Sequence, residues 1–127
     1  MAICYKQREV ANQIASMTVI GDVKGKDIII VDDMCDTAGT MVKAVKTLVE
    51  KGPSRVICAI TQGIFTRPAL ERINSWDSIK SVIVSNSLPQ EYNMSKWDKI
   101  DSFDFSRLIC VVILCIGWGD SISALFW

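Results

Sequence analysis

The chain has 127 residues, half of them hydrophobic, which is enough apolar material for one domain with a buried core. Its 14 basic and 14 acidic residues cancel, so no net charge favours the capture of nucleic acid or of an anionic membrane. The composition therefore excludes a strongly basic nucleic-acid binder and favours a globular domain with a largely buried sheet.

Cysteine and histidine usage restricts the chemistry further. The five cysteines are odd in number, form no C-x-x-C pair and have no histidine beside them, so the sequence carries no recognisable zinc site. Free thiols fit a reducing, cytoplasmic setting, which is the simplest interpretation. The absence of histidine also removes the usual general base and the Ser–His or Cys–His nucleophile pairs.

Neither end of the sequence predicts membrane insertion. Lys6 and Arg8 interrupt the short apolar start, so the sequence shows no signal peptide. The longest apolar run, residues 108–118, has about half of the ~20 residues that a membrane span needs. We therefore expect no membrane partner, and the balanced charge predicts no nucleic-acid partner.

The first residues predict a short strand over 2–5 and then a polar, charged break over 6–9. Lys6 and Arg8 stand two residues apart within this break. Taken alone, such a pair is most simply a solvated turn, because long charged side chains are mostly exposed.

Residues 27–40 are the stretch around which the rest of the chain is organised. Four consecutive apolar residues, 28–31, predict a strand buried on both faces. Asp32 and Asp33 follow where that strand should end, and the small and polar residues 36–40 then lead into a helical pattern. Ligands of open α/β sheets bind outside the carboxyl ends of strands, and helix N-termini favour phosphate. Acidic residues suit sugar hydroxyls or Mg²⁺ held through water, so this stretch predicts a ligand with both a phosphate and a polyol.

Each of these residues also has a simpler structural interpretation. An acidic pair after a strand is usually a turn or a cap, and Asp36 is of the type most common at a helix N-cap. Gly39 has a structural interpretation as the glycine of a tight turn, although a glycine also lets a phosphate approach the backbone closely. Because caps and phosphate sites coincide at helix N-termini, these interpretations do not exclude a binding site.

The segments after this stretch predict alternating helices and strands. Apolar residues at 41, 44, 45, 48 and 49 form one stripe of an amphipathic helix, which Thr37 or Thr40 would cap. Residues 55–61, 81–85 and 99–105 predict further strands. A strand, a helix and a second strand make a right-handed βαβ unit with parallel strands. The predicted fold class is therefore α/β, a doubly wound, mostly parallel sheet with flanking helices.

Residues 108–118 carry no charge at all. A helix that is apolar on every side must be covered on every side. We therefore expect a partner domain or another subunit to cover this segment, or this end of the chain to fold poorly.

Several segments together resemble a known family. Residues 31–40, VDDMCDTAGT, look like the phosphoribosyl-pyrophosphate loop of type I phosphoribosyltransferases. Residues 20–26 and 85–90 and the tail 119–126 resemble ribose-phosphate pyrophosphokinase, or phosphoribosyl pyrophosphate (PRPP) synthetase. The resemblance corresponds only to the C-terminal domain of that family. It implies that residues 1–127 form a single phosphoribosyltransferase-like domain without a counterpart of the N-terminal domain.

The family transfers pyrophosphate from MgATP to ribose 5-phosphate, giving PRPP and AMP. The resemblance implies that Asp32 and Asp33 orient the ribose and hold the cofactor Mg²⁺, in part through water. It also implies a set of residues that bind the 5-phosphate, namely Asp36, Thr37, Ala38, Gly39 and Thr40.

The resemblance implies a catalytic role for Lys6 and Arg8, which keep the spacing of a lysine and an arginine in a mobile catalytic loop of the family. They would stabilise charge that develops on the transferred phosphates. The ATP site would lie largely in the missing half or on a neighbouring subunit, and the full-length family forms homo-oligomers. Gln62 stands where the family commonly has histidine, which puts any role at that position in doubt.

Three functions stay open at this stage. The chain is part of a ribose-phosphate diphosphokinase that is inactive alone, a non-catalytic subunit associated with PRPP synthetase, or another phosphoribosyltransferase. Residues 86–89 and the tail 119–126 argue against the third function.

Overall fold

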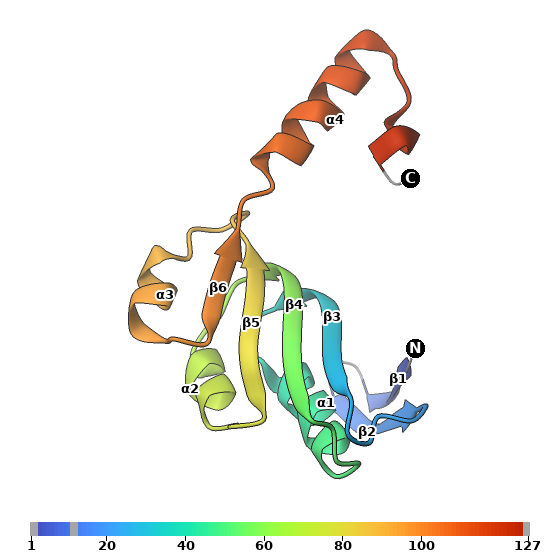
Figure 1. Ribbon diagram of the computed structural model, residues 1–127, viewed down its shortest axis with the longest axis vertical. Coiled ribbons are helices and arrows are strands. Elements are labelled where there is room, and N and C mark those ends of the chain that lie inside the picture. The colour runs from blue at the N-terminus through green and yellow to red at the C-terminus, as the bar shows by residue number, and fades with distance from the viewer. Residues whose placement is uncertain (1–2, 11–12, 126–127) are drawn as a thin grey trace.

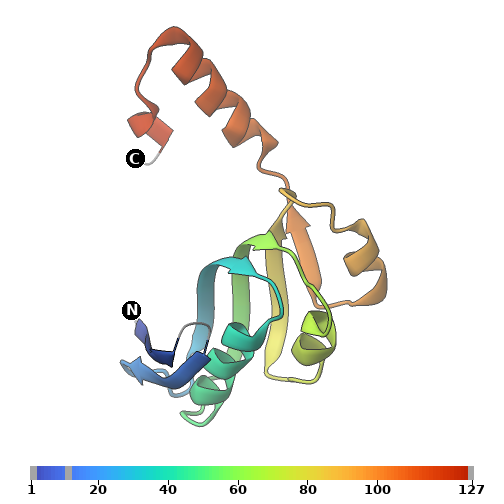
Figure 2. The same cartoon turned by 180° about the vertical axis from the view of Figure 1, so that it is seen from behind.

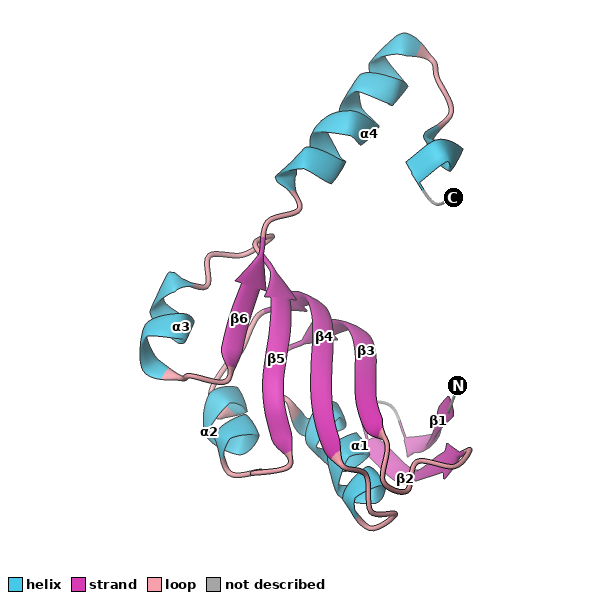
Figure 3. Cartoon of the chain, in the orientation of Figure 1, coloured by secondary structure: helices cyan, strands magenta, loops and turns pink. Residues whose placement is uncertain are grey.

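The computed structural model describes residues 3–10 and 13–125, with side chains from residue 19 onward except that of Ala124. A four-stranded parallel sheet in the order β3-β4-β5-β6 forms its centre (Figure 1). Its strands are β3 (Asp27–Cys35), β4 (Arg55–Gly63), β5 (Ile79–Ser85) and β6 (Ile100–Phe103). The connecting helices are α1 (Gly39–Val49), α2 (Ala69–Asn74) and α3 (Glu91–Lys96). This arrangement confirms the predicted α/β class with a parallel sheet and flanking helices (Figure 3).

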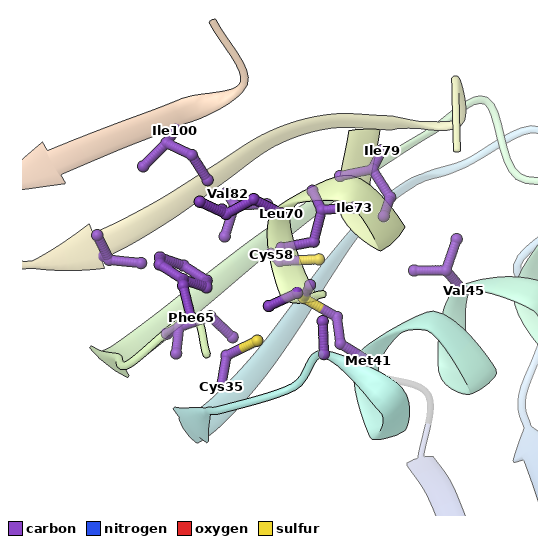
Figure 4. Close-up of a cluster of buried hydrophobic side chains, with 14 of the residues drawn as sticks. Cys35, Met41, Val45, Cys58, Phe65, Leu70, Ile73, Ile79, Val82 and Ile100 are labelled. Atoms are coloured by element: carbon purple, nitrogen blue, oxygen red, sulfur yellow. The ribbon is translucent and has the colours of Figure 1, made fainter. Parts of the chain in front are cut away.

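The main core lies between the sheet and helices α1 and α2, which cover the same face (Figure 2). The buried residues of α1 are those of the predicted apolar stripe, apart from Val49, which is exposed. Alternate residues of β4 and β5 point into the same core, because successive side chains of a strand face opposite sides. Figure 4 shows side chains of this core, among them Cys58, Phe65, Ile73, Ile79 and Val82.

The prediction that β3 is buried on both faces is wrong. Ile28 and Ile30 pack against the core, but Ile29 and Val31 on the other face are 65% and 78% exposed. β3 is an edge strand of the four-stranded sheet, and its outward face carries no covering layer among the described residues. An apolar run shows that a strand can be buried on both faces, but it does not show that a second layer is present.

The predicted polar break at residues 6–9 is also wrong. The N-terminal segment forms a hairpin of β1 (Ile3–Val10) and β2 (Gln13–Ile20), in which Lys6 lies opposite Met17 and Arg8 opposite Ile14. Cross-strand pairing therefore overrides the local polarity of the sequence. The hairpin adjoins α1, because Val19 joins a small cluster with Leu48 and accepts a hydrogen bond of 2.8 Å from Lys51 Nζ.

The apolar C-terminal run forms helix α4 (Ser106–Trp118), which is followed by the short 3₁₀-helix η1 (Ile122–Leu125). No residue of α4 is buried, and the helix points away from the sheet (Figures 1 and 2). Asp104 fixes the junction with β6, since it accepts hydrogen bonds from Ser106 N and Asn86 Nδ2 at 2.9 and 2.7 Å. These hydrogen bonds hold the pKa of Asp104 below its usual value, and those from Ser106 have the largest effect. No helix within the described part of the chain is long and apolar enough to cross a membrane.

Gly63 ends β4 at a position where a side chain does not fit. A Cβ there would lie 2.6 Å from Cε2 of Phe65 and 3.1 Å from Cγ1 of Val84. Phe65 itself has a φ of 51°, in the left-handed region, and this turn folds its ring back against Gly63 and into the core. The exit of β4 is thus shaped by the close approach of one aromatic ring.

We expect Gly63→Ala to lower the free energy of unfolding by about 1–3 kcal/mol, because the added methyl group overpacks against the Phe65 ring. Urea denaturation followed by circular dichroism measures this change. Gly117→Ala is the matched control, since a Cβ at that exposed helical position meets nothing within 4 Å. Equal stability of Gly63→Ala and the wild type would contradict the tight fit.

Candidate functional site

A cavity of about 260 Å³ lies where β3 ends and α1 begins. It is lined by the consecutive residues from Asp32 to Thr40. The structure therefore brings together all the sequence-predicted sugar-phosphate residues, which are Asp32, Asp33, Asp36, Thr37, Ala38, Gly39 and Thr40. The cavity opens at the carboxyl end of the parallel sheet, the usual place for a ligand in such folds.

The chain enters α1 through a left-handed residue. Ala38 is the N-cap, with φ 59° and ψ 9°, and no side chain makes a capping hydrogen bond there. The prediction that Thr37 or Thr40 caps this helix is therefore wrong, as is the alternative of an Asp36 cap. The left-handed turn changes the chain direction without a side-chain cap. The first turn of α1 therefore begins beside the cavity, and no side chain caps its backbone N–H groups. Such N–H groups at a helix N-terminus favour an anion.

Two later segments hold the cavity loop in place. The backbone amides of Ile64 and Phe65 both donate to the Cys35 carbonyl, at 3.0 and 3.1 Å. From α2, Arg72 Nη1 donates to the Thr37 carbonyl at 2.9 Å. Sequence reasoning missed Arg72, because 35 residues separate it from Thr37 and no local pattern marks the contact.

Three of the residues that line the cavity, Asp32, Asp33 and Asp36, are acidic. Asp32 is half-buried and its Oδ1 accepts a hydrogen bond from the Asp33 amide at 3.1 Å, while Asp33 and Asp36 are exposed. Among the residues whose side chains the structure describes, no lysine or arginine lines the cavity. Among the described residues, no cluster of three or more histidine, cysteine or acidic side chains could hold a metal by itself. A Mg²⁺ ion here would take one or two carboxylates and complete its shell with ligand oxygens and water, which is its usual mode of binding.

Cys35 lines the cavity but is only 3% exposed. Burial raises its pKa to about 11, and the charges of Asp32 and Asp36 add to this effect, whereas the Ala38 backbone hydrogen bond opposes it. Burial likewise raises the pKa of Cys58 to about 12. Both groups are therefore neutral thiols near pH 7 and serve as core residues, since the thiolate is the reactive form.

We expect iodoacetamide at pH 8 to alkylate the exposed Cys110 at least tenfold faster than Cys35 or Cys58, because the two buried thiols are both inaccessible and protonated. Peptide mass spectrometry after timed quenching measures each site separately. Full denaturation in guanidinium serves as the control and should equalise the rates. Rapid labelling of Cys35 in the folded chain would show that its pKa is not raised.

The two predicted catalytic residues occupy a different element. Lys6 and Arg8 lie within β1, in backbone register with β2, and not in a loop. Their side chains lie outside the described part of the structure, so their proximity to the cavity stays a prediction. Gln62 lies within β4, where it pairs with Met34, and it does not line the cavity.

The family model described as "phosphoribosyl synthetase-associated domain" matches residues 6–127. The chain belongs to the phosphoribosylpyrophosphate synthetase family. Its structure is similar to a crystal structure of phosphoribosylpyrophosphate synthetase from Mycobacterium smegmatis, with 34% sequence identity and a TM-score of 0.72. The match covers 84% of this chain and 35% of the mycobacterial chain, so the chain spans about a third of that synthetase. The family predicted from the sequence is thereby confirmed.

Proposed function

We propose that the cavity binds ribose 5-phosphate together with Mg²⁺, as the sugar-phosphate part of a ribose-phosphate diphosphokinase. In that reaction pyrophosphate passes from ATP to ribose 5-phosphate, and the products are PRPP and AMP. The proposal rests on one observation: three carboxylates and the uncapped start of α1 line the same cavity. Groups that suit a phosphate and groups that suit sugar hydroxyls therefore lie within the consecutive residues from Asp32 to Thr40.

The two ends of the cavity suit different parts of the ligand. Residues 36–40, which include the start of α1, would hold the 5-phosphate through backbone amides and the hydroxyls of Thr37 and Thr40. Asp32 and Asp33, at the end of β3, would accept hydrogen bonds from the ribose hydroxyls and hold Mg²⁺ in part through water. Mg²⁺ would neutralise phosphate charge and orient the sugar.

Lys6 and Arg8 are the proposed catalytic cations. Pyrophosphate transfer depends mainly on positioning and on neutralising the charge of the phosphates, so two cations beside the transferred group would lower the barrier. The ATP site and a homo-oligomeric assembly are proposals for the whole protein, since this chain spans 35% of the mycobacterial synthetase.

A second candidate is a non-catalytic subunit associated with the synthetase. The position of Lys6 and Arg8 favours it, because both lie in a paired strand and not in a loop that could close on a substrate. The two candidates share the cavity but differ in chemistry, so a turnover measurement separates them.

For sugar-phosphate binding, we expect Asp33→Asn to weaken ribose 5-phosphate at least about tenfold, or about 1.4 kcal/mol, in the presence of Mg²⁺. The variant loses a charge that the metal requires, and isothermal titration calorimetry measures the affinity. Removal of Mg²⁺ with EDTA should reduce wild-type affinity to a similar level. Asp77→Asn is the control, because Asp77 is also exposed but lies before the amino end of β5, whereas the cavity lies at the carboxyl end of the parallel strands. Unchanged affinity in Asp33→Asn would move the site away from this cavity.

For catalysis, we expect the 127-residue chain alone to release no measurable AMP from MgATP and ribose 5-phosphate, because it spans only a third of the mycobacterial synthetase. A coupled assay of AMP on monodisperse protein makes the measurement. Robust turnover that Lys6→Ala abolishes would refute this expectation and exclude the associated-subunit candidate. A changed rate of the complete mycobacterial synthetase after addition of the chain would instead support that candidate.

A further inference from the structure

Arg72 reaches the cavity loop from another element. It lies on α2, is exposed to solvent and donates from Nη1 to the Thr37 carbonyl at 2.9 Å. The same nitrogen lies 3.8 Å from the position that a Cβ at Gly39 would occupy. Arg72 is not among the residues that line the cavity.

The Thr37–Ala38 peptide is held at both of its polar ends. Its carbonyl accepts from Arg72, and in a planar trans peptide the N–H of Ala38 points the opposite way. That N–H forms a hydrogen bond with the buried Cys35 thiol. The two contacts fix the orientation of the peptide that precedes the first turn of α1.

This orientation includes a strained residue. Ala38 has a φ of 59°, in the left-handed region, which is strained for a residue other than glycine. No side chain caps the helix at Ala38, so the strain is not compensated there. The Arg72 hydrogen bond has a charged donor, and such bonds are stronger than those between neutral groups. It therefore stabilises the turn through a contact from α2.

The charge of Arg72 also matters at this place. Three of the described residues that line the cavity carry carboxylates and none carries a cation, and negative charge of this kind is unfavourable for a phosphate. A guanidinium beside residues 37–39 lowers the negative potential where the phosphate would bind, although Arg72 does not line the cavity.

We propose that Arg72 is a positioning residue of the sugar-phosphate site, which holds the Thr37–Ala38 peptide so that the first-turn amides of α1 face a phosphate. This role rests on the proposed binding of ribose 5-phosphate. Arg72 acts through the loop backbone and does not itself touch the ligand.

The test compares Arg72→Met with Arg107→Met, which removes the same charge from an exposed arginine on α4. Calorimetry with ribose 5-phosphate and Mg²⁺ should show an affinity about tenfold lower for Arg72→Met and unchanged for Arg107→Met. Arg72→Lys restores the charge and one donor but not the planar fork, so it should recover part of the loss at low salt and less at 0.5 M salt. Equal affinity in the Arg72→Met, Arg107→Met and wild-type proteins would overturn the proposal.

Amide hydrogen exchange of residues 35–40 in the ligand-free proteins gives a second measurement. Arg72→Met should speed exchange in this loop, with no change in the urea midpoint of the whole domain, and Arg107→Met should not. If the wild type binds no ribose 5-phosphate, the proposed function fails, and the exchange rates still decide whether Arg72 orders the loop. Unchanged exchange in Arg72→Met would overturn the positioning role whatever the ligand.

Discussion

The structure depends most on how the chain turns from β3 into α1. The Cys35 carbonyl at the end of β3 accepts the amides of Ile64 and Phe65, so the exits of two neighbouring strands are joined at one atom. Gly63 leaves room for the Phe65 ring beside this junction, and Ala38 completes the turn in a left-handed conformation. These contacts position the end of β3 and the turn into α1, whose residues line the cavity.

Local patterns were sufficient to predict the βαβ unit and the position of its loop. The apolar spacing of α1 matches the residues buried in the structure except Val49, and the predicted sugar-phosphate residues all line one cavity. Features set by distant parts of the chain were not predictable in this way. The contact of Arg72 with Thr37 joins residues 35 positions apart, which no local window of sequence contains. The β1–β2 hairpin is local, but the polar run at residues 6–9 concealed its first strand.

The outward face of β3 shows a different limit of sequence reasoning. Ile29 lies beside Ile57 and Val31 beside Ala59, so the apolar side chains of neighbouring strands form a continuous strip on the uncovered face. Parallel sheets are ordinarily covered on both faces. Helix α4, like this strip, is apolar and has no buried residue. The residues of a strand determine whether burial is favourable, but a second layer determines whether burial occurs.

The acidity of the cavity leads to a thermodynamic constraint on any phosphate ligand. Two unit charges 4 Å apart repel by about 4 kcal/mol at the effective dielectric constant of a protein surface, so three carboxylates cannot accept a phosphate unaided. The start of α1 and the Arg72 guanidinium contribute positive potential from one side, and Mg²⁺ would contribute it from the other. Metal and sugar phosphate should then each increase the affinity of the other, because the coupling free energy between two ligands is reciprocal. Asp32 and Asp33 would on this view serve the phosphate indirectly, by holding the cation that neutralises it.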